Sequence, residues 1–101
     1  KTSTGDTALI TAVGYEDIAC IKILLSSGAS INETNNDDTT ALMTAAMAGN
    51  LEIVQLLLQK GARIEMKDRE GKTAAQIAEE AGHAEIARLL RESLRRSAGN
   101  R

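Results

Sequence analysis

Apolar and polar positions divide the chain into short helix-like blocks separated by polar stretches. In the middle of the chain, the alanine-rich block 40–48 ends at Gly49, a residue suited to the left-handed turn after a helix. Asn50 then stands where a cap is needed, and the apolar block that starts at Leu51 continues to the next stop signal, Gly61. The pattern predicts two short consecutive helices.

The same blocks recur at a fixed interval. Gly28 and Gly61 are 33 positions apart, and series of threonines and alanines keep the same spacing. Aligned without a gap, residues 35–67 share ten identities with residues 2–34 and ten with residues 68–100. Chance would give about two at ordinary composition. The chain is therefore predicted to contain three repeats.

Each repeat predicts a helix, a turn, a second helix and a polar loop. Asp17 matches Asn50 as a cap, and the polar stretches Ser30–Thr39 and Arg63–Lys72 are rich in residues that favour turns. Helices of eight to ten residues are unstable alone, because their nucleation is costly. They persist when neighbouring pairs stack their apolar faces, which predicts an all-α solenoid.

In every unit, several residues match the sequence pattern of ankyrin repeats, so the three units resemble that family. The resemblance is carried by residues 5–29, 40–62 and 68–90 and covers essentially the whole chain. It implies a single domain, residues 1–101, folded as an ankyrin-repeat solenoid of three helix-turn-helix units with hairpin-like loops. A tetratricopeptide array, the nearest rival, would repeat at about 34 residues and carry large aromatic positions that are missing here.

The chain departs from the family pattern at several points. The family's Thr-Pro-Leu-His tetrapeptide corresponds to residues 7–10, 40–43 and 73–76, which have lost both the proline and the histidine. We therefore expect weaker polar links between units and more reliance on burial. In the first unit the glycine comes two places early, at Gly14, so the end of that helix departs from the pattern.

The two ends of the chain differ in character. Over residues 7–26, ten of twenty positions are larger apolar types and three are charged, whereas residues 73–92 have four and six. The third unit is predicted to be a C-terminal cap. Its last helix is expected to run to about Arg96, because Leu94 replaces the glycine stop. The first unit is expected to pack against further repeats of a longer parent chain or against a partner.

Composition excludes several classes of function. Tyr15 is the only aromatic residue, so the core must be aliphatic and an RNA-binding domain that stacks bases on aromatic rings is excluded. A net charge of −2 does not fit a generic nucleic-acid binder. No apolar run approaches the ~18 residues of a membrane span, and no signal peptide is visible. One cysteine forms no intrachain disulfide and suits a cytoplasmic protein, or a nuclear one in a eukaryote.

Reactive side chains are too few to suggest an enzyme. His83 is the only histidine, and the family pattern expects a structural histidine there. Cys20 aligns with Ile53 and Ile86, which predicts a packed thiol rather than a nucleophile. Residues 71–73, Gly-Lys-Thr, lack the upstream glycine of a phosphate-binding loop. We expect no catalytic residues, no cofactor and no metal.

The resemblance implies a protein-binding surface on the concave side of the stack, at the loop tips and the exposed ends of the first helices. Tyr15 and Met47 would form its apolar centre inside a charged rim, although both could simply cover the groove between helices. Asn32 resembles the loop asparagine that is hydroxylated in some animal ankyrin repeats. The expected partner-binding residues are Ser3, Thr4, Asp6, Tyr15, Asn36, Asp37, Thr39, Met47, Arg69, Glu70, Lys72 and Glu80.

The predicted function is non-enzymatic protein–protein interaction, as a monomer unless the first unit self-associates. The alternative is a structural or regulatory segment of a larger multidomain protein that packs against its own parent chain. A basic C-terminal stretch, residues 83–101 with a balance of +3, reads as a solvated cap helix or as a docking patch for an acidic partner. Neither nucleic acid nor a membrane is an expected partner.

Overall fold

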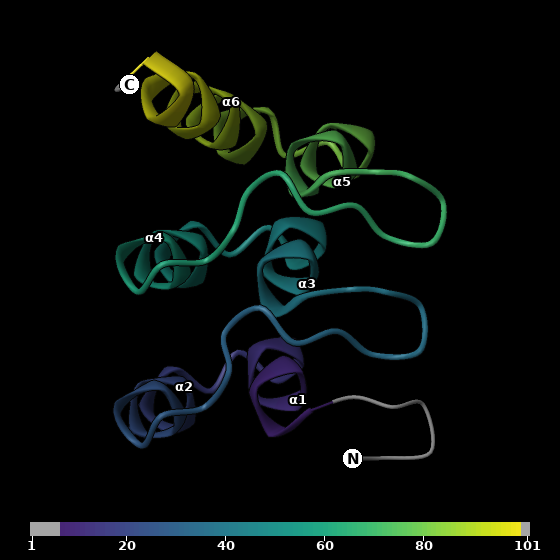
Figure 1. Ribbon diagram of the computed structural model, residues 1–101. Helices are drawn as coiled ribbons and strands as arrows, with labels where there is room; N and C mark the ends of the chain where they lie inside the picture. Colours follow the sequence, from purple (N-terminus) through teal and green to yellow (C-terminus); the bar gives the residue numbers. More distant parts are fainter. Residues whose placement is uncertain (1–6, 100–101) are drawn as a thin grey trace.

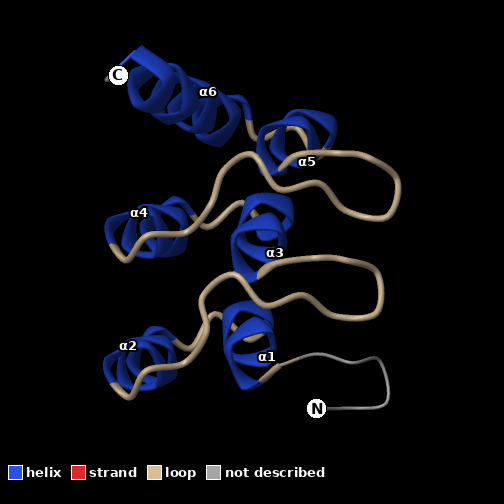
Figure 2. Ribbon diagram, viewed as in Figure 1, coloured by secondary structure: helices blue, strands red, loops and turns tan. Residues whose placement is uncertain are grey.

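The computed structural model describes residues 7–99, with side chains through Arg96. Six α-helices and no strand occur in this range, so the all-α prediction is confirmed (Figure 2). The helices are α1 (Ala8–Gly14), α2 (Ile18–Ser26), α3 (Ala41–Ala48), α4 (Leu51–Gln59), α5 (Ala74–Glu80) and α6 (Ala84–Gly99).

The helices form three stacked pairs, α1 with α2, α3 with α4 and α5 with α6 (Figure 1). The first helices lie side by side, with α3 packed between α1 and α5. The second helices form a second layer beside the first helices, and the long loops project from the opposite side of the stack. Each pair therefore covers one side of the next, as stacking of short helices requires.

Polar caps replace the missing proline at the start of the helices. Thr7, Thr40 and Thr73 precede the first helices, and each hydroxyl accepts a hydrogen bond from a backbone N–H in the first turn at 3.1 to 3.3 Å. Asp17 and Asn50 cap α2 and α4 through their side-chain oxygens at 3.2 and 3.1 Å. These bonds satisfy backbone donors that have no partner within the helix. The predicted capping roles of Asp17 and Asn50 are confirmed.

The first helices end differently in the three units. Gly49 adopts a left-handed conformation after α3, with a φ of 81°, and Gly82 does the same after α5. In the first unit this position is Glu16, which has a φ of 57°, while Gly14 lies inside α1. The displaced glycine therefore leaves a glutamate in a conformation that L-residues adopt at a cost.

The core is aliphatic and receives side chains from all six helices. Small alanines of α3 and α5, such as Ala45 and Ala78, are fully buried where the first helices approach each other. Larger aliphatic residues of the second helices close the core from the other side. Those with no exposed surface are Ile21, Ile53, Val54, Leu57 and Leu90.

The prediction of a packed thiol at Cys20 is wrong. Cys20 is exposed, although the equivalent Ile53 and Ile86 are 0% and 3% exposed. The second and third units have a preceding unit beside this position, whereas no described unit lies against that side of the first. Alignment gave the correct position in the repeat, but burial at that position depends on the neighbouring unit.

The two complete loops have hairpin-like tips without forming strands. The Asn35 N–H donates to the Thr39 carbonyl at 3.1 Å, and the Asp68 N–H donates to the Lys72 carbonyl at 2.9 Å. The side-chain oxygens of Asn35 and Asp68 also accept backbone N–H bonds within the same turns. Each tip is thus held by one residue, Asn35 or Asp68, and these two residues occupy equivalent positions 33 residues apart.

The third unit ends the stack with a charged surface. The charged side chains of α6, such as Arg88 and Arg95, are exposed, which agrees with the predicted polar cap. Arg91 also joins α6 to α5 through an ion pair with Glu79 at 2.7 Å, and its hydrogen bond lowers the pKa of the Glu79 carboxyl. The last helix continues past the predicted end at Arg96 to Gly99.

Candidate functional site

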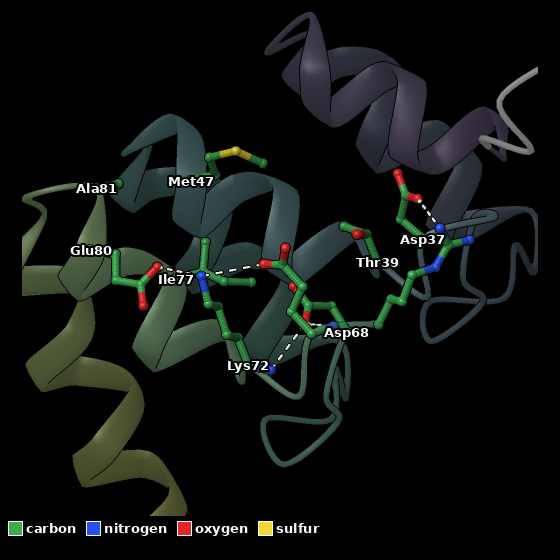
Figure 3. Close-up of a pocket in the computed structure, with 10 residues that line it drawn as sticks. Asp37, Thr39, Met47, Asp68, Lys72, Ile77, Glu80 and Ala81 are labelled. Atoms are coloured by element: carbon green, nitrogen blue, oxygen red, sulfur yellow. Dashed lines mark hydrogen bonds and ion pairs between the residues drawn. The ribbon is translucent and has the colours of Figure 1, made fainter.

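A pocket of about 550 Å³ opens between the loop tips and the first helices of the second and third units (Figure 3). One wall comes from the tip of the loop before α3 and the other from the loop before α5. The ends of α3 and α5 form its floor. The lining residues are Asp37, Thr39, Met47, Asp68, Arg69, Glu70, Lys72, Ile77, Glu80 and Ala81.

The floor of the pocket is apolar and accessible. Met47 lies near the end of α3 and is 55% exposed, and Ile77 of α5 is half-buried beside it. Ile77 corresponds to Thr11 and Thr44 in the preceding units, so only the third unit places an isoleucine at this position. Methionine adapts its shape easily, which suits it to contact with an irregular apolar surface.

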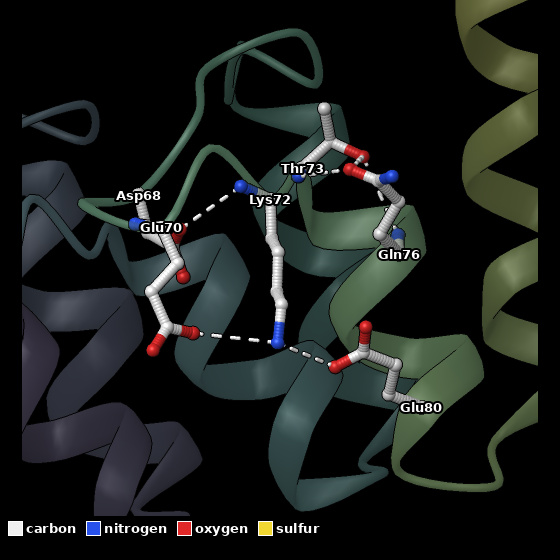
Figure 4. A network of polar contacts seen from close by, with 6 residues as sticks. All are labelled: Asp68, Glu70, Lys72, Thr73, Gln76 and Glu80. Atoms are coloured by element: carbon white, nitrogen blue, oxygen red, sulfur yellow. Dashed lines mark hydrogen bonds and ion pairs between the residues drawn. The ribbon is translucent and has the colours of Figure 1, made fainter.

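A lysine bridges two carboxylates at the rim (Figure 4). The Lys72 Nζ lies 2.8 Å from the Glu80 Oε1 and 3.3 Å from the Glu70 Oε1. Hydrogen bonds to Glu80 and then to Glu70 raise the pKa of the Lys72 ammonium. A raised lysine pKa means that the bridge is fully formed at neutral pH and is lost only as the pH rises through that pKa. The Lys72 ammonium therefore stays charged across the neutral range.

Arg69 joins the two loop tips across the pocket. Its guanidinium Nη1 lies 3.5 Å from the Asp37 Oδ1, and its Nη2 donates to the Asn36 carbonyl at 2.5 Å. The Arg69 backbone N–H also donates to the Asp37 carbonyl at 3.0 Å. These contacts position one rim relative to the other, so the pocket is preorganised rather than formed by independent loops.

Seven of the twelve predicted site residues line this pocket together. They are Asp37, Thr39, Met47, Arg69, Glu70, Lys72 and Glu80.

The remaining predicted residues lie elsewhere. Asn36 contributes a backbone carbonyl to Arg69 without lining the pocket, and Tyr15 lies after α1 with 82% of its surface exposed. Ser3, Thr4 and Asp6 are outside the described residues. The pocket therefore draws its residues from the second and third units.

Sequence reasoning missed two lining residues, Asp68 and Ile77, whereas Ala81 is one of the first-helix ends expected on the concave side. The equivalence of Asp68 to Asn35 signals a structured loop tip. A comparison of the three units contains a signal for Ile77, because this position is threonine in the other two units and apolar only in the third.

His83 and Asn32 make contacts between units. The His83 imidazole lies so close to Gly49 that a Cβ added there would be 2.4 Å from a ring atom. The Asn32 Oδ1 accepts a hydrogen bond from the Arg63 N–H at 2.8 Å, which joins the loops of the first and second units. The hydroxylation suggested for Asn32 by the resemblance stays a prediction.

The exposed thiol of Cys20 has a carboxylate beside it. A hydrogen bond with Asp17 and the charge of that carboxylate raise the pKa of Cys20. A raised pKa lowers the thiolate fraction at neutral pH, which is the opposite of what a cysteine nucleophile requires.

Replacing Asp17 with asparagine is therefore expected to increase the rate at which iodoacetamide alkylates Cys20 at pH 7.5. Asparagine still caps α2 but removes the negative charge, so the thiol pKa falls toward its ordinary value. The difference is expected to disappear at a pH well above both pKa values. Equal rates of the two proteins at pH 7.5 would show that Asp17 does not influence the thiol.

Residues 7–99 contain no group of three or more His, Cys, Asp or Glu side chains that could hold a metal ion. No helix in this range is both long enough and apolar enough to cross a membrane.

Comparison with known proteins assigns the repeats. A family model described as ankyrin repeats, in three copies, matches residues 9–98. A search of curated protein sequences found no match to the chain. The match covers all three helix pairs and includes every residue that lines the pocket.

Proposed function

The chain belongs to the ankyrin repeat family, whose members are generally protein-interaction modules, and from this premise we propose that it binds a protein partner through the pocket between its second and third units. The observation that carries the proposal is the combination of an exposed apolar floor at Met47 with a charged rim held by ion pairs. Apolar centres with polar rims are typical of protein interfaces.

The charges of the rim favour a basic partner segment. Four carboxylates and two cations line the pocket, and both cations already have carboxylate partners. The surplus is therefore negative. We propose that the partner inserts an apolar side chain over Met47 and Ile77 and places lysine or arginine beside this side chain. Such complementarity speeds association and selects partners more than it adds affinity.

The proposed role requires no catalysis. The pocket contains neither the histidine nor the cysteine of the chain, and the raised pKa of Cys20 opposes its use as a nucleophile. Carboxylates engaged in ion pairs and turns position the loops. We propose that the chain acts by binding alone.

The double variant Met47→Ala, Glu80→Ala is expected to reduce partner capture by about tenfold or more, because truncation of central interface residues costs at least ~1.4 kcal/mol when they anchor the partner. Immobilised wild-type and variant chains would be compared as baits by quantitative mass spectrometry. Both side chains are exposed, so the melting temperature should stay nearly unchanged.

Gln55→Ala is the matched control, since Gln55 is exposed on α4 and does not line the pocket. It should capture the same proteins as the wild type. Tyr15→Ala measures whether the binding surface extends to the first unit. Unchanged capture by the Met47/Glu80 variant would remove the pocket from the proposal.

A further inference from the structure

One side of the first unit exposes apolar positions that are covered in both following units. Ile23 on α2 is 64% exposed, whereas the equivalent Leu56 and Leu89 are partly buried against the core. Ala8 and Cys20 are also exposed, and the first-unit face is defined here by these three residues, Ala8, Cys20 and Ile23. Their counterparts are Ala41 and Ala74, exposed by 0% and 1%, and Ile53 and Ile86, exposed by 0% and 3%.

The preceding unit explains the burial of these counterparts. The second and third units each have a helix pair stacked on this side, and the first has none among residues 7–99 (Figure 1). The first-unit face therefore carries apolar residues at positions that are covered in both following units.

The opposite end of the stack shows how this chain finishes a solenoid. There α6 exposes Arg91 and Arg95 at the positions where the second unit has the partly buried Leu58 and Ala62, and this keeps the end of the stack polar toward solvent. The first-unit face instead consists of an alanine, a cysteine and an isoleucine, with the Asp17 carboxylate beside the thiol. It resembles an internal interface and not a terminal cap.

We propose that the first-unit face docks another ankyrin-type repeat, stacked in the register that joins the first unit to the second. This stacking contact is separate from the proposed pocket between the second and third units, because it uses a different face, different residues and a different kind of partner. If the chain is a segment that packs against its own parent protein, the proposal specifies that the packing element is another ankyrin-type repeat. The proposed contact continues the stack, because it repeats the two interfaces that join the first unit to the second and the second to the third.

A second copy of this chain fits the face less well. Head-to-tail stacking would press the charged end of α6 against Ala8, Cys20 and Ile23, and burying unpaired arginines there is costly. A symmetrical pair of first units is the remaining arrangement, and the experiment distinguishes it.

Cys20 provides a reporter for this face, because it is exposed and is the only cysteine. A copy of residues 35–67, which brings no second cysteine, would be joined directly before residue 2 so that the spacing of 33 is kept. The reaction of Cys20 with Ellman's reagent should then slow by about tenfold or more, since access would require local opening. The melting temperature should rise by at least ~5 °C because a new interface forms.

Ile23→Asp provides the matched variant. In the fused chain it should restore the fast reaction of Cys20, whereas Lys22→Asp should not, because Lys22 and its counterparts Gln55 and Arg88 are all exposed. In the 101-residue chain, Ile23→Asp should leave the melting temperature nearly unchanged, since its side chain is already exposed.

Two results would overturn the proposal. The first is a fused chain that folds, by circular dichroism, with Cys20 as reactive as before. The second is a 101-residue chain that dimerises in sedimentation equilibrium, with Cys20 becoming protected as the concentration rises. That result would assign the face to a second copy. Neither result affects the proposal that the pocket binds a partner, because the pocket is tested by separate variants at Met47 and Glu80.

Discussion

Ile53→Ala is expected to lower the free energy of unfolding by about 2 to 5 kcal/mol, the range for truncating a fully buried isoleucine. Ile53 has no exposed surface, and the neighbouring unit prevents the site from closing over the lost atoms without a rearrangement. Urea unfolding followed by circular dichroism at 222 nm would measure the change, since the chain has no tryptophan.

The matched control is Cys20→Ala at the same position of the first unit. Cys20 is exposed, so its truncation should change the free energy of unfolding by less than about 0.5 kcal/mol. The contrast isolates the effect of a preceding unit, because both residues occupy the same place in their helices. Equal losses for the two variants would contradict the interpretation that stacking between units buries this position.

Gly49→Ala is expected to destabilise the protein more than Gly28→Ala. Both glycines have left-handed φ angles, 81° and 92°, so each alanine should cost about 1 to 2 kcal/mol in backbone strain. At Gly28 nothing lies within 4 Å of an added Cβ, whereas at Gly49 the Cβ would meet the His83 ring at 2.4 to 2.8 Å. Displacing that ring should cost about 1 kcal/mol more.

A double-mutant cycle tests the origin of the additional cost. Combining Gly49→Ala with His83→Ala should recover the steric part, because the ring that the new methyl group meets is gone. The same His83→Ala change should not rescue Gly28→Ala. If His83→Ala left the difference between the two glycine variants intact, the contact between His83 and Gly49 would not be its cause.

Local chemistry made most of the fold predictable. The capping roles of Asp17 and Asn50 and the left-handed Gly49 depend on a few neighbouring residues, and the sequence contains those residues directly. The spacing of 33 then carried the assignment to all three units. The end of the first unit's first helix was less predictable, because the alignment placed Glu16 where the other units have glycine but did not show that Glu16 would keep the left-handed turn.

Burial at the ends of the stack could not be read from alignment. Cys20 shares its position with Ile53 and Ile86, but its exposure depends on whether a unit lies beside it. The last helix also ends later than expected, at Gly99 and not at about Arg96.

The candidate site was predictable in its rim and less so in its floor. The tips containing Asp37 and Lys72 are polar and repeat in the sequence, so their position on one side of the stack followed from the repeat. Ile77 was missed because its helix position is threonine in the other units, and only the structure brings it beside Met47. The bridging role of Arg69 likewise depends on how adjacent loops lie in space.

The central claim is that the pocket between the second and third units binds the partner. Methyl chemical-shift mapping tests it most directly, using the chain labelled at methionine and isoleucine methyl groups and titrated with the captured partner. The account predicts that the largest shifts occur at Met47 and Ile77. Shifts confined to side chains outside the pocket, such as Ile23, with none at Met47 or Ile77, would contradict it.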